Sequence, residues 1–462
     1  MRTIQPTRRW LELFLLACAW SLGVLGSLQV AWTTNQPVTQ TMWIMTGAVG
    51  GIAIVAHLIV RWRLPYADPF MLPVATMLTI LGLVMIYRLD IAAAQSAQRH
   101  GDPVPTPDVY AQLTWYAVAT VLFIMVILLI RDHRRLQRYT YTCGLLGLVL
   151  LIIPMVPGIG ATVNGATLWV RLGSFTFQPA EAAKILLTVF FAGYLVVTRD
   201  SLAVVRTKFL GIGLPRARDL GPILVAWLAS LAVLIFEKDL GTSLLFFGLF
   251  VAMLFIATQR RAWLVLGFLL FLVGALGSYF AFNHVRVRVQ VWLDPFAYAS
   301  NEGYQIVQAL YGFGNGGLFG TGLGNGYPQL VPFANTDFIV SALGEELGLT
   351  GLFAILVLYA VLIERGLRAA VSVRDPFGQL LAAGLAVTMG LQVFIIFGGV
   401  TRLIPLTGLT TPFLSYGGSS LVANWVMVAL LLVVSHRARR PVEVVATDAD
   451  APTQVVPIAR GR

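Results

Sequence analysis

Residues 335–363, NTDFIVSALGEELGLTGLFAILVLYAVLI, join a long apolar run to three acidic side chains, Asp337, Glu345 and Glu346. The apolar part is long enough to cross a lipid bilayer as a helix, which requires about 20 residues. An ionised carboxylate is costly to bury in a membrane, so acidic residues in such segments usually face an interior cavity and have a partner. The stretch therefore indicates a membrane-spanning helix with a polar site close to its beginning.

The whole chain shares this apolar character. Of its 462 residues, 58% are hydrophobic and only 11% are charged, and the mean hydropathy is +0.80. A soluble domain carries about 25% charged residues, so we predict an all-α polytopic membrane protein. We count about twelve transmembrane helices at the usual span length. The apolar windows begin near Leu11, Met42, Met71, Ala111, Tyr141, Pro179, Leu220, Leu240, Ala262, Asp337, Gly378 and Thr411.

The positive charges are distributed unevenly along the chain. The net charge of +11 does not indicate a nucleic-acid partner, because the basic residues gather in short connections such as RDHRRLQR at 131–138 and SHRARR at 435–440. The alternate connections are poor in basic residues, and clusters of Lys and Arg mark the cytoplasmic side. We therefore predict a multi-pass protein of the cytoplasmic membrane with both termini in the cytoplasm. The polar segment 441–462 is predicted to be a disordered cytoplasmic tail.

Cysteine and histidine usage gives no indication of a disulfide framework or a metal site. Cys18 and Cys143 both lie inside apolar runs. The five histidines are scattered and do not form a ligand set; they are His57, His100, His133, His284 and His436.

One outward connection is far longer than the others. Residues 283–333, between the predicted ninth and tenth spans, form an extracellular loop rich in Gly and aromatic residues, including YGFGNGGLFGTGLGNGYPQL at 311–330. Connections between elements usually have about 4–6 residues, and long loops on a rigid scaffold often carry function. The alternative interpretation is a flexible surface segment.

Two acids of the opening stretch have different explanations. Asp337 lies at the outer mouth of its helix, where Asn335 or Thr336 could cap the helix and a negative charge would favour the positive helix end. Glu345 lies eight residues further along, about 12 Å deeper at helical rise. A capping role cannot account for Glu345, so we expect it to face an interior cavity.

Further charged residues lie near the same side of the membrane. Glu181 and Lys184 in FQPAEAAKI are three residues apart and share a helix face; the alternative is an internal salt bridge at the membrane edge. Asp239 in FEKDLGTSLL either belongs to a site or simply caps the following helix, together with Thr242 and Ser243.

Arg286 and Arg288 in NHVRVRVQVWLDP alternate with valines on a side where arginines are scarce. If the segment is extended, both guanidinium groups point the same way and suit a phosphate or pyrophosphate; the alternative is contact with lipid headgroups. Ser415 belongs to PFLSYGGSS, whose paired glycines allow close helix approach or a helix break beside a cavity. No histidine stands in a recognisable relation to Ser415, so we find no catalytic serine arrangement.

Six ordered segments between Asn164 and Ser420 resemble the SEDS family of RodA/FtsW-type glycosyltransferases. The matching segments are NGATLWVRLGSFTFQPAEAAK, KDLGTSLL, RVRVQVWLDP, GYQIVQALYGFGNGGLFGTGLGNG, NTDFIVSALGEELGLTG and IPLTGLTTPFLSYGGSS. The family usually has ten spans, so the resemblance implies about two additional N-terminal spans. We predict N-terminal helices at 1–130, a catalytic core at 131–440 and the tail at 441–462.

The resemblance implies a peptidoglycan glycosyltransferase that polymerises lipid II into glycan strands at the outer face of the membrane, for elongation and shape or for division. Asp337 matches the aspartate that the family needs for polymerisation, and Asn335 stands where the family commonly has histidine. Glu181 and Lys184 match residues that look like cavity-lining functional groups. The expected partner is a class B penicillin-binding protein transpeptidase. The sequence leaves open whether a divalent cation such as Mg or Mn accompanies the pyrophosphate.

The expected mechanism uses these residues together. Asp337 would act as the general base on the acceptor 4-hydroxyl, and Arg286, Arg288 and Lys184 would stabilise the leaving pyrophosphate. Glu181 would hold Lys184 in place, and Glu345 would tune the cavity. One alternative is a flippase or transporter of the lipid-linked precursor, in which buried charges mark a substrate pathway. Another is a noncatalytic scaffold, which leaves the acids unexplained.

Overall fold

The computed structural model describes residues 7–156, 158–163, 166–172, 175–203, 207–209, 212–214 and 239–441, with single positions at 225, 228, 229 and 232. Within this part, ten helices are long and apolar enough to cross a membrane. They are α1 (Arg9–Thr33), α2 (Gln40–Arg63), α3 (Met71–His100), α4 (Asp108–Leu129), α7 (Pro179–Ala203), α9 (Leu240–Thr258), α10 (Arg261–Ala281), α13 (Ile339–Ser372), α14 (Pro376–Val400) and α15 (Gly418–Arg439). The predicted polytopic helical architecture is confirmed.

Two of the twelve predicted spans do not correspond to these ten helices. The window beginning near Tyr141 forms the short helix α6 (Thr140–Ile152), which continues as the 3₁₀ turn η1 (Ile153–Met155). The window beginning near Leu220 lies outside the described residues, as do the predicted tail beyond Pro441 and Asn164. The total of twelve therefore stays a prediction.

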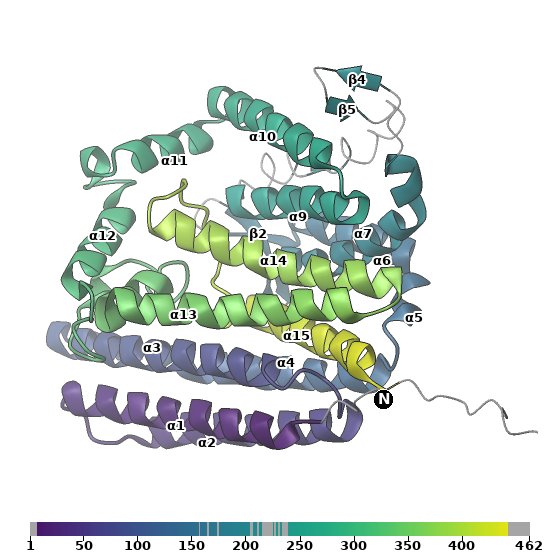
Figure 1. Cartoon of the computed structure of the whole chain (residues 1–462). Coiled ribbons are helices and arrows are strands. Elements are labelled where there is room, and N and C mark those ends of the chain that lie inside the picture. The colour runs from purple at the N-terminus through teal and green to yellow at the C-terminus, as the bar shows by residue number, and fades with distance from the viewer. Residues whose placement is uncertain are drawn as a thin grey trace, which may run out of the picture.

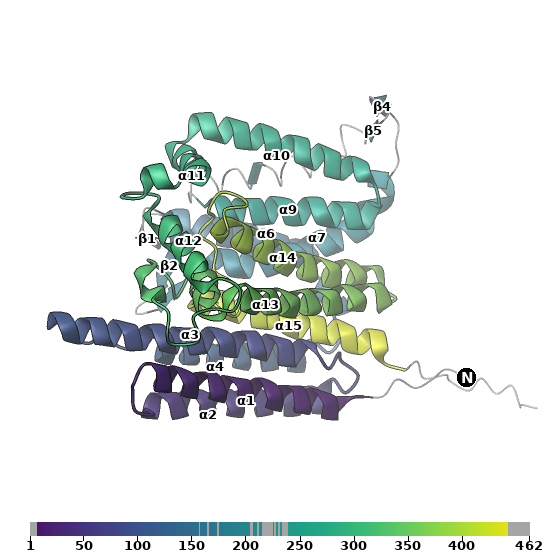
Figure 2. The same ribbon diagram turned by 60° about the vertical axis from the view of Figure 1, so that its left-hand side comes forward.

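The helices lie side by side in one bundle, with α1 and α2 at one edge and α10 at the opposite edge (Figures 1 and 2). α3, α14 and α15 are the most buried of the spanning helices, and α10 is the least buried. Arg9 at the start of α1 and Arg439 at the end of α15 both donate to the carbonyl of Ala67. The described chain therefore begins and ends at the same end of the bundle, as the predicted topology requires.

The helix starts follow from local capping chemistry. The Asp375 carboxylate accepts a hydrogen bond from the Gly378 N–H at 2.7 Å, and Pro376 occupies the first position of α14. The Asp239 carboxylate accepts from the Thr242 N–H at 3.0 Å and caps α9. Neither Asn335 nor Thr336 caps α13, because the N-cap residue of this helix is Phe338 and no side chain bonds to its first turn. The capping interpretation is thus confirmed for Asp239 and wrong for Asn335 and Thr336.

A break at Gly348 divides α13 into two parts. Gly348 has φ 70° and ψ −174°, and a Cβ atom there would lie 2.3 Å from the Gly320 nitrogen. The interrupted backbone bonds to the glycine-rich segment instead, since the Thr321 and Gly322 N–H groups donate to the carbonyls of Glu345 and Glu346 at 3.0 Å. Irregular backbone at a helix break is tolerated where other protein groups satisfy it.

The connection at residues 283–333, which was predicted to face outward, is largely helical. It contains α11 (Asn283–Leu293), η3 (Phe296–Tyr298), α12 (Tyr304–Gly316) and η4 (Pro328–Leu330). Most of the connection is therefore regular secondary structure, and its functional role stays a prediction. The expectation of an extended segment for Arg286 and Arg288 is wrong, because residues two apart on a helix point to different faces.

Two small sheets accompany the helices in the described chain. β1 (Gly160–Val163), β2 (Ala166–Leu172) and β3 (Phe175–Phe177) form an antiparallel sheet in that order. β4 (Thr207–Phe209) and β5 (Ile212–Leu214) form a separate hairpin. The three-stranded sheet leads into α7 and places β2 beside the polar cavity described below.

The N-terminal helices α1 and α2 are connected to the rest of the bundle by contacts at both ends of α1. Near its start, Arg9 and His57 contact the buried Glu12 carboxylate, and Arg9 Nε donates to the Pro65 carbonyl at 3.2 Å. At its far end, the Thr33 hydroxyl donates to the Leu323 carbonyl at 2.8 Å. The helix pair therefore touches the same glycine-rich segment that fills the break in α13.

Candidate active site

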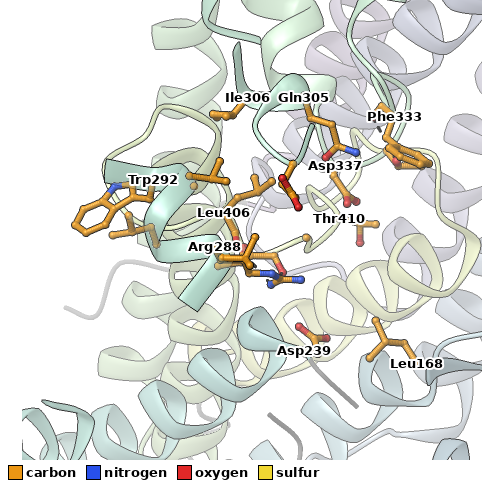
Figure 3. Close-up of a pocket in the computed structure, with 18 of the residues that line it drawn as sticks. Leu168, Asp239, Arg288, Trp292, Gln305, Ile306, Phe333, Asp337, Leu406 and Thr410 are labelled. Atoms are coloured by element: carbon orange, nitrogen blue, oxygen red, sulfur yellow. Dashed lines mark hydrogen bonds between the residues drawn. The ribbon is translucent and has the colours of Figure 1, made fainter. Parts of the chain in front are cut away.

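A polar cavity of about 470 Å³ opens at the end of the bundle where α7, α9 and α13 begin (Figure 3). Helices α11 and α12, strand β2 and the connection between α14 and α15 complete its wall. It is lined by Leu168, Trp169, Gln178, Asp239, Val287, Arg288, Val291, Trp292, Glu302, Gln305, Ile306, Phe333, Thr336, Asp337, Gly399, Arg402, Ile404, Leu406, Thr407, Gly408, Thr410 and Tyr416.

Asp337 lies at this cavity on the short segment that precedes α13. Its carboxylate is half-buried, and the backbone of Gly408, with φ 76°, passes close to it. Burial and, to a lesser extent, the negative charge of Asp239 raise the pKa of Asp337, the guanidinium of Arg288 lowers it, and the net result is a pKa of about 7. A carboxyl group with a pKa near neutrality can accept a proton at physiological pH, as a general base must.

Asp239 and Arg288 face the same space as Asp337 (Figure 3). Asp239 is buried, and burial raises its pKa, against the hydrogen bonds from Thr242 and the charge of Arg288. Arg288 projects from α11, and its Nη1 donates to the carbonyls of Leu406 at 3.4 Å and Thr407 at 3.2 Å. One cation thus lies among two carboxylates and two carbonyls, in a cavity large enough for a polar ligand.

Lys184 and Glu181 form the expected pair but lie behind the cavity wall. Lys184 Nζ is 2.5 Å from Glu181 Oε2 and donates to Gln392 Oε1 at 2.8 Å. Gln392 in turn donates to the Thr410 carbonyl at 3.0 Å, and Thr410 lines the cavity. The expectation that both charges line the cavity is therefore corrected: they form an internal salt bridge that supports the loop bearing Thr410.

Arg286 points away from the cavity. Its Nη2 donates to the Phe280 carbonyl at 3.0 Å, and its guanidinium lies 6.0 Å from the ring centroid of Tyr279. Since α11 is a helix, only Arg288 of the two arginines is directed at the cavity. The expected pair of phosphate-binding arginines is therefore reduced to one.

Glu345 and Ser415 do not line the cavity, but each hydrogen-bonds to the backbone of a segment near it. Glu345 is buried and accepts from the Tyr327 N–H at 3.0 Å, so it anchors the glycine-rich segment and is not among the lining residues. Ser415 Oγ donates to the Thr336 carbonyl at 2.6 Å and accepts from the Thr411 N–H at 2.8 Å. Ser415 therefore joins the segment carrying Asp337 to the connection between α14 and α15.

Several polar lining residues were not singled out from the sequence. Glu302 and Gln305 come from the start of α12, and Gln178 precedes α7. Arg402 donates to the Trp292 carbonyl at 2.8 Å and the Leu293 carbonyl at 2.5 Å, and so closes the C-terminal end of α11 at the cavity rim. The polar positions of NEGYQIVQ in an otherwise apolar segment were an available signal for Glu302 and Gln305.

The metal-ligand chemistry of the cavity is limited. Within the described part of the chain, no three His, Cys, Asp or Glu side chains gather in a metal-binding group. Asp239 and Asp337 are the buried or half-buried carboxylates that a cation entering this cavity would meet. Such a cation would take its remaining ligands from the substrate and water, as Mg²⁺ commonly does.

An apolar groove of about 370 Å³ adjoins the cavity. It lies between α9, α10, α11 and α14 and shares Ile404 and Thr407 with the cavity lining. Its other lining residues are Leu240, Ser243, Leu244, Phe247, Phe271, Gly274, Ala275, Ser278, Val285, Val289, Phe394 and Pro405. A polar cavity and an apolar groove therefore meet at the α14–α15 connection.

Comparison with known proteins identifies relatives over most of the chain. A family model described as a cell cycle protein, FtsW/RodA/SpoVE, matches residues 69–440. The peptidoglycan glycosyltransferase RodA of Mycobacterium bovis is 51% identical over 443 residues, covering 94% of this chain and 92% of that protein. The probable peptidoglycan glycosyltransferase FtsW of Geobacter metallireducens is 36% identical over 381 residues, covering 80% of this chain and 95% of that protein. The family model begins after α2.

Solved structures with the same fold are also known. A chain of a peptidoglycan synthase complex, described for its coordination of polymerization and crosslinking, is 27% identical with a TM-score of 0.63 and covers 81% of this chain and 98% of that chain. The crystal structure of the Thermus thermophilus rod shape determining protein RodA is 26% identical with a TM-score of 0.53, and covers 81% of this chain and 98% of that chain.

Proposed function

Because the chain belongs to the FtsW/RodA/SpoVE family of cell cycle proteins, we propose that it is a peptidoglycan glycosyltransferase. It polymerises lipid II into glycan strands at the outer face of the cytoplasmic membrane, in cell elongation and shape or in division. The observation that carries the catalytic assignment is Asp337, a carboxylate with a pKa of about 7 in a polar cavity that it shares with Arg288.

Asp337 serves as the general base of this reaction. The acceptor sugar presents a 4-hydroxyl, which is a weak nucleophile, and a positioned base accelerates such proton transfers by about 10²–10⁴-fold. The hydroxyl proton passes to the Asp337 carboxylate as the oxygen bonds to the anomeric carbon of the donor. The bond from that carbon to the pyrophosphate oxygen breaks, and the pyrophosphate leaves with the electron pair.

Arg288 stabilises the leaving pyrophosphate. A cation aimed at the charge that develops in the transition state lowers the barrier more than it does in water, because the site is partly closed to solvent. Arg288 donates to two backbone carbonyls in the absence of substrate, and a phosphate oxygen is a stronger, charged acceptor. Lys184 and Arg286 contribute only indirectly, given their distance from the lining.

The polyprenyl chain of lipid II takes the apolar groove between α9, α10, α11 and α14. The groove meets the polar cavity at Ile404 and Thr407, so a molecule with a polar head and an apolar tail can occupy both. This arrangement supports a lipid-linked substrate over a soluble sugar nucleotide.

The cavity faces outward and both termini face the cytoplasm. The basic connections adjoin the end of α2, the start of α10 and the end of α15, which lie at the end of the bundle opposite the start of α13. Basic connections mark the cytoplasmic side, and this distribution supports an outward position for Asp337. A class B penicillin-binding protein transpeptidase is the proposed partner, in keeping with the structural relative that belongs to a peptidoglycan synthase complex.

Glycan synthesis from purified lipid II tests the proposed function. Asp337→Asn and Asp337→Ala are expected to abolish polymer formation, whereas the matched control Asp294→Asn, an exposed aspartate of the same outer segment outside the cavity lining, retains it. Normal glycan synthesis by both Asp337 variants would rule out the base. Adding the transpeptidase partner in a parallel reaction tests whether the chain is active alone.

A flippase of the same precursor is the alternative function. Lipid II supplied only on the outer side of reconstituted vesicles separates the two, since a polymerase makes glycan there and a flippase makes none. A noncatalytic scaffold would give no product in either arrangement and would not depend on Asp337.

A further inference from the structure

A second polar cleft lies at the end of the bundle opposite Asp337. It has a volume of about 360 Å³ and is bounded by α5 (Arg134–Gln137), the connection between α13 and α14, and the end of α15. These three parts converge at the right-hand end of the bundle in Figure 1. The cleft is lined by Arg134, Ser372, Val373, Arg374, Asp375, Arg437, Ala438, Arg440 and Pro441.

The cleft carries an excess of positive charge. Four guanidinium groups line it, and of the described lining residues Asp375 alone is acidic. The Asp375 carboxylate is already engaged by the Gly378 N–H at 2.7 Å, by His133 Nε2 at 2.9 Å and by Arg134 Nε at 3.4 Å. Burial favours a higher pKa for Asp375, but these partners outweigh it and hold the pKa below its usual range. The carboxylate therefore stays ionised without neutralising the other arginines.

The arginines come from parts of the chain that are distant in sequence. Arg134, Arg374 and Arg437 belong to three different elements and reach one cavity only in the folded bundle. Charge on single connections follows from membrane topology alone, but topology does not require the connections to share one cleft. Arg437 Nη2 also lies 3.8 Å from Asp132 Oδ2, a long contact at an exposed site that is worth little.

The chemistry of the rim distinguishes a lipid from a soluble anion. Val371, which immediately precedes the lining residue Ser372, is 84% exposed. Tyr139, two residues beyond the end of α5, is also exposed, and exposed tyrosines are typical of the membrane–water interface. A ligand with a phosphate and an apolar body would satisfy both the arginines and this rim.

We propose that this four-arginine cleft binds the phosphate group of an anionic phospholipid from the adjacent membrane leaflet. Arginine suits the role because its planar fork donates two parallel hydrogen bonds to phosphate oxygens. Basic pockets between transmembrane helices are known lipid-headgroup sites. The bound lipid holds α5, the α13–α14 connection and α15 together, and so stabilises the folded chain by mass action. The proposal does not depend on the glycosyltransferase assignment.

The test uses the purified full-length chain in an uncharged detergent. Phosphatidylglycerol, phosphatidylcholine and inorganic phosphate are added separately, and retained lipid is counted by native mass spectrometry while unfolding temperature is recorded. The wild type is expected to retain phosphatidylglycerol and to gain thermal stability from it alone. The double variant Arg374→Gln/Arg437→Gln should lose about 30-fold in affinity, at about fivefold for each arginine.

Arg368→Gln is the matched control, because Arg368 lies near the same end of α13, pairs with Glu364 at 2.6 Å and is not among the lining residues. It is expected to bind as the wild type does. If the double variant unfolds, Arg374→Lys/Arg437→Lys, which keeps the charges and loses the forks, is expected to fold and bind with intermediate affinity. Unchanged binding in both double variants would overturn the site. Equal stabilisation by inorganic phosphate would overturn the lipid as its source.

Discussion

The rate of glycan synthesis should depend steeply on pH, because Asp337 must be ionised to accept the acceptor's proton. The pKa of this carboxyl is raised from 3.8 to about 7 by burial and by Asp239, against Arg288. That rise corresponds to about 4 kcal/mol in favour of the protonated form. With a pKa near 7, about one-tenth of Asp337 is ionised at pH 6 and about nine-tenths at pH 8. The rate at pH 6 should therefore be about tenfold lower than the rate at pH 8.

A single substitution separates this explanation from a general effect of acid. Asp239→Asn removes the negative charge that helps to raise the pKa of Asp337, and its amide oxygen can still accept from the Thr242 N–H that caps α9. The acidic limb of the profile should therefore move to lower pH, toward the ordinary range of an aspartate. Asp294→Asn, outside the cavity, should leave the limb in place.

The assay is polymer formation from lipid II at saturating substrate, measured from pH 5.5 to 9 in one mixed buffer at constant ionic strength. Each variant's unfolding temperature is measured across the same range to exclude denaturation. A rate that is flat between pH 6 and pH 8 would refute the base assignment. A limb that stays near pH 7 in Asp239→Asn would refute the coupling between the two carboxylates.

Three further perturbations test other parts of the structure. Because the pKa of Asp337 is higher in the folded than in the unfolded chain, ionisation of this carboxyl destabilises the folded state as the pH rises from about 4 to 7. Asp337→Asn should therefore raise the unfolding temperature more at pH 8 than at pH 5, and an equal increase at both pH values would contradict this. Arg288→Gln should lower kcat by about 10²-fold and shift the acidic limb of the pH profile to higher pH, while Arg288→Lys should return the limb to its wild-type pH and recover only part of kcat. Unaltered kinetics of Arg288→Gln in a glycan assay would exclude contact between Arg288 and the pyrophosphate. Gly348→Ala should cost about 1–3 kcal/mol, because its φ of 70° and the 2.3 Å approach to Gly320 leave no room for a Cβ, whereas Gly314→Ala in α12, with nothing within 4 Å, should be neutral or slightly stabilising in a thermal unfolding assay.

The helical membrane architecture could be read from local sequence because it depends on local properties. A run of apolar side chains partitions into lipid whatever its neighbours are, so ten of the twelve predicted windows coincide with apolar helices long enough to span. The windows near Tyr141, Leu220 and Leu240 are the weakest in the sequence, because Pro and Gly interrupt the first and FEKDLG divides the other two; of these, the Leu240 window forms α9 and the Leu220 window lies outside the described residues. In the first, Pro154 lies in a 3₁₀ turn that ends a helix of only 13 residues.

The composition of the site was only partly accessible from sequence. Asp337, Asp239 and Arg288 do meet at one cavity. The prediction that Arg286 lines the cavity beside Arg288 was wrong because the segment is helical. Residues two apart point to different faces of a helix, whereas an extended strand would align them. The prediction that Lys184 and Glu345 face the cavity was wrong for a different reason. A charged residue in an apolar segment can line a ligand cavity, form an internal salt bridge or anchor a backbone segment, and the sequence does not distinguish these roles.

The sequence by itself determined that the chain is a membrane protein of many helices, where its polar positions lie along the spans, and that Asp337 begins a span. These follow from hydropathy and spacing, which are properties of neighbouring residues. Only the tertiary structure decided which polar side chains line the same cavity. Arg288 is brought to Asp337 by the helical turn of α11, and Lys184 is instead enclosed by Gln392 and Asn424 from two other helices. The rotation of a helix and the identity of its neighbours depend on packing over hundreds of residues, and no local pattern encodes them.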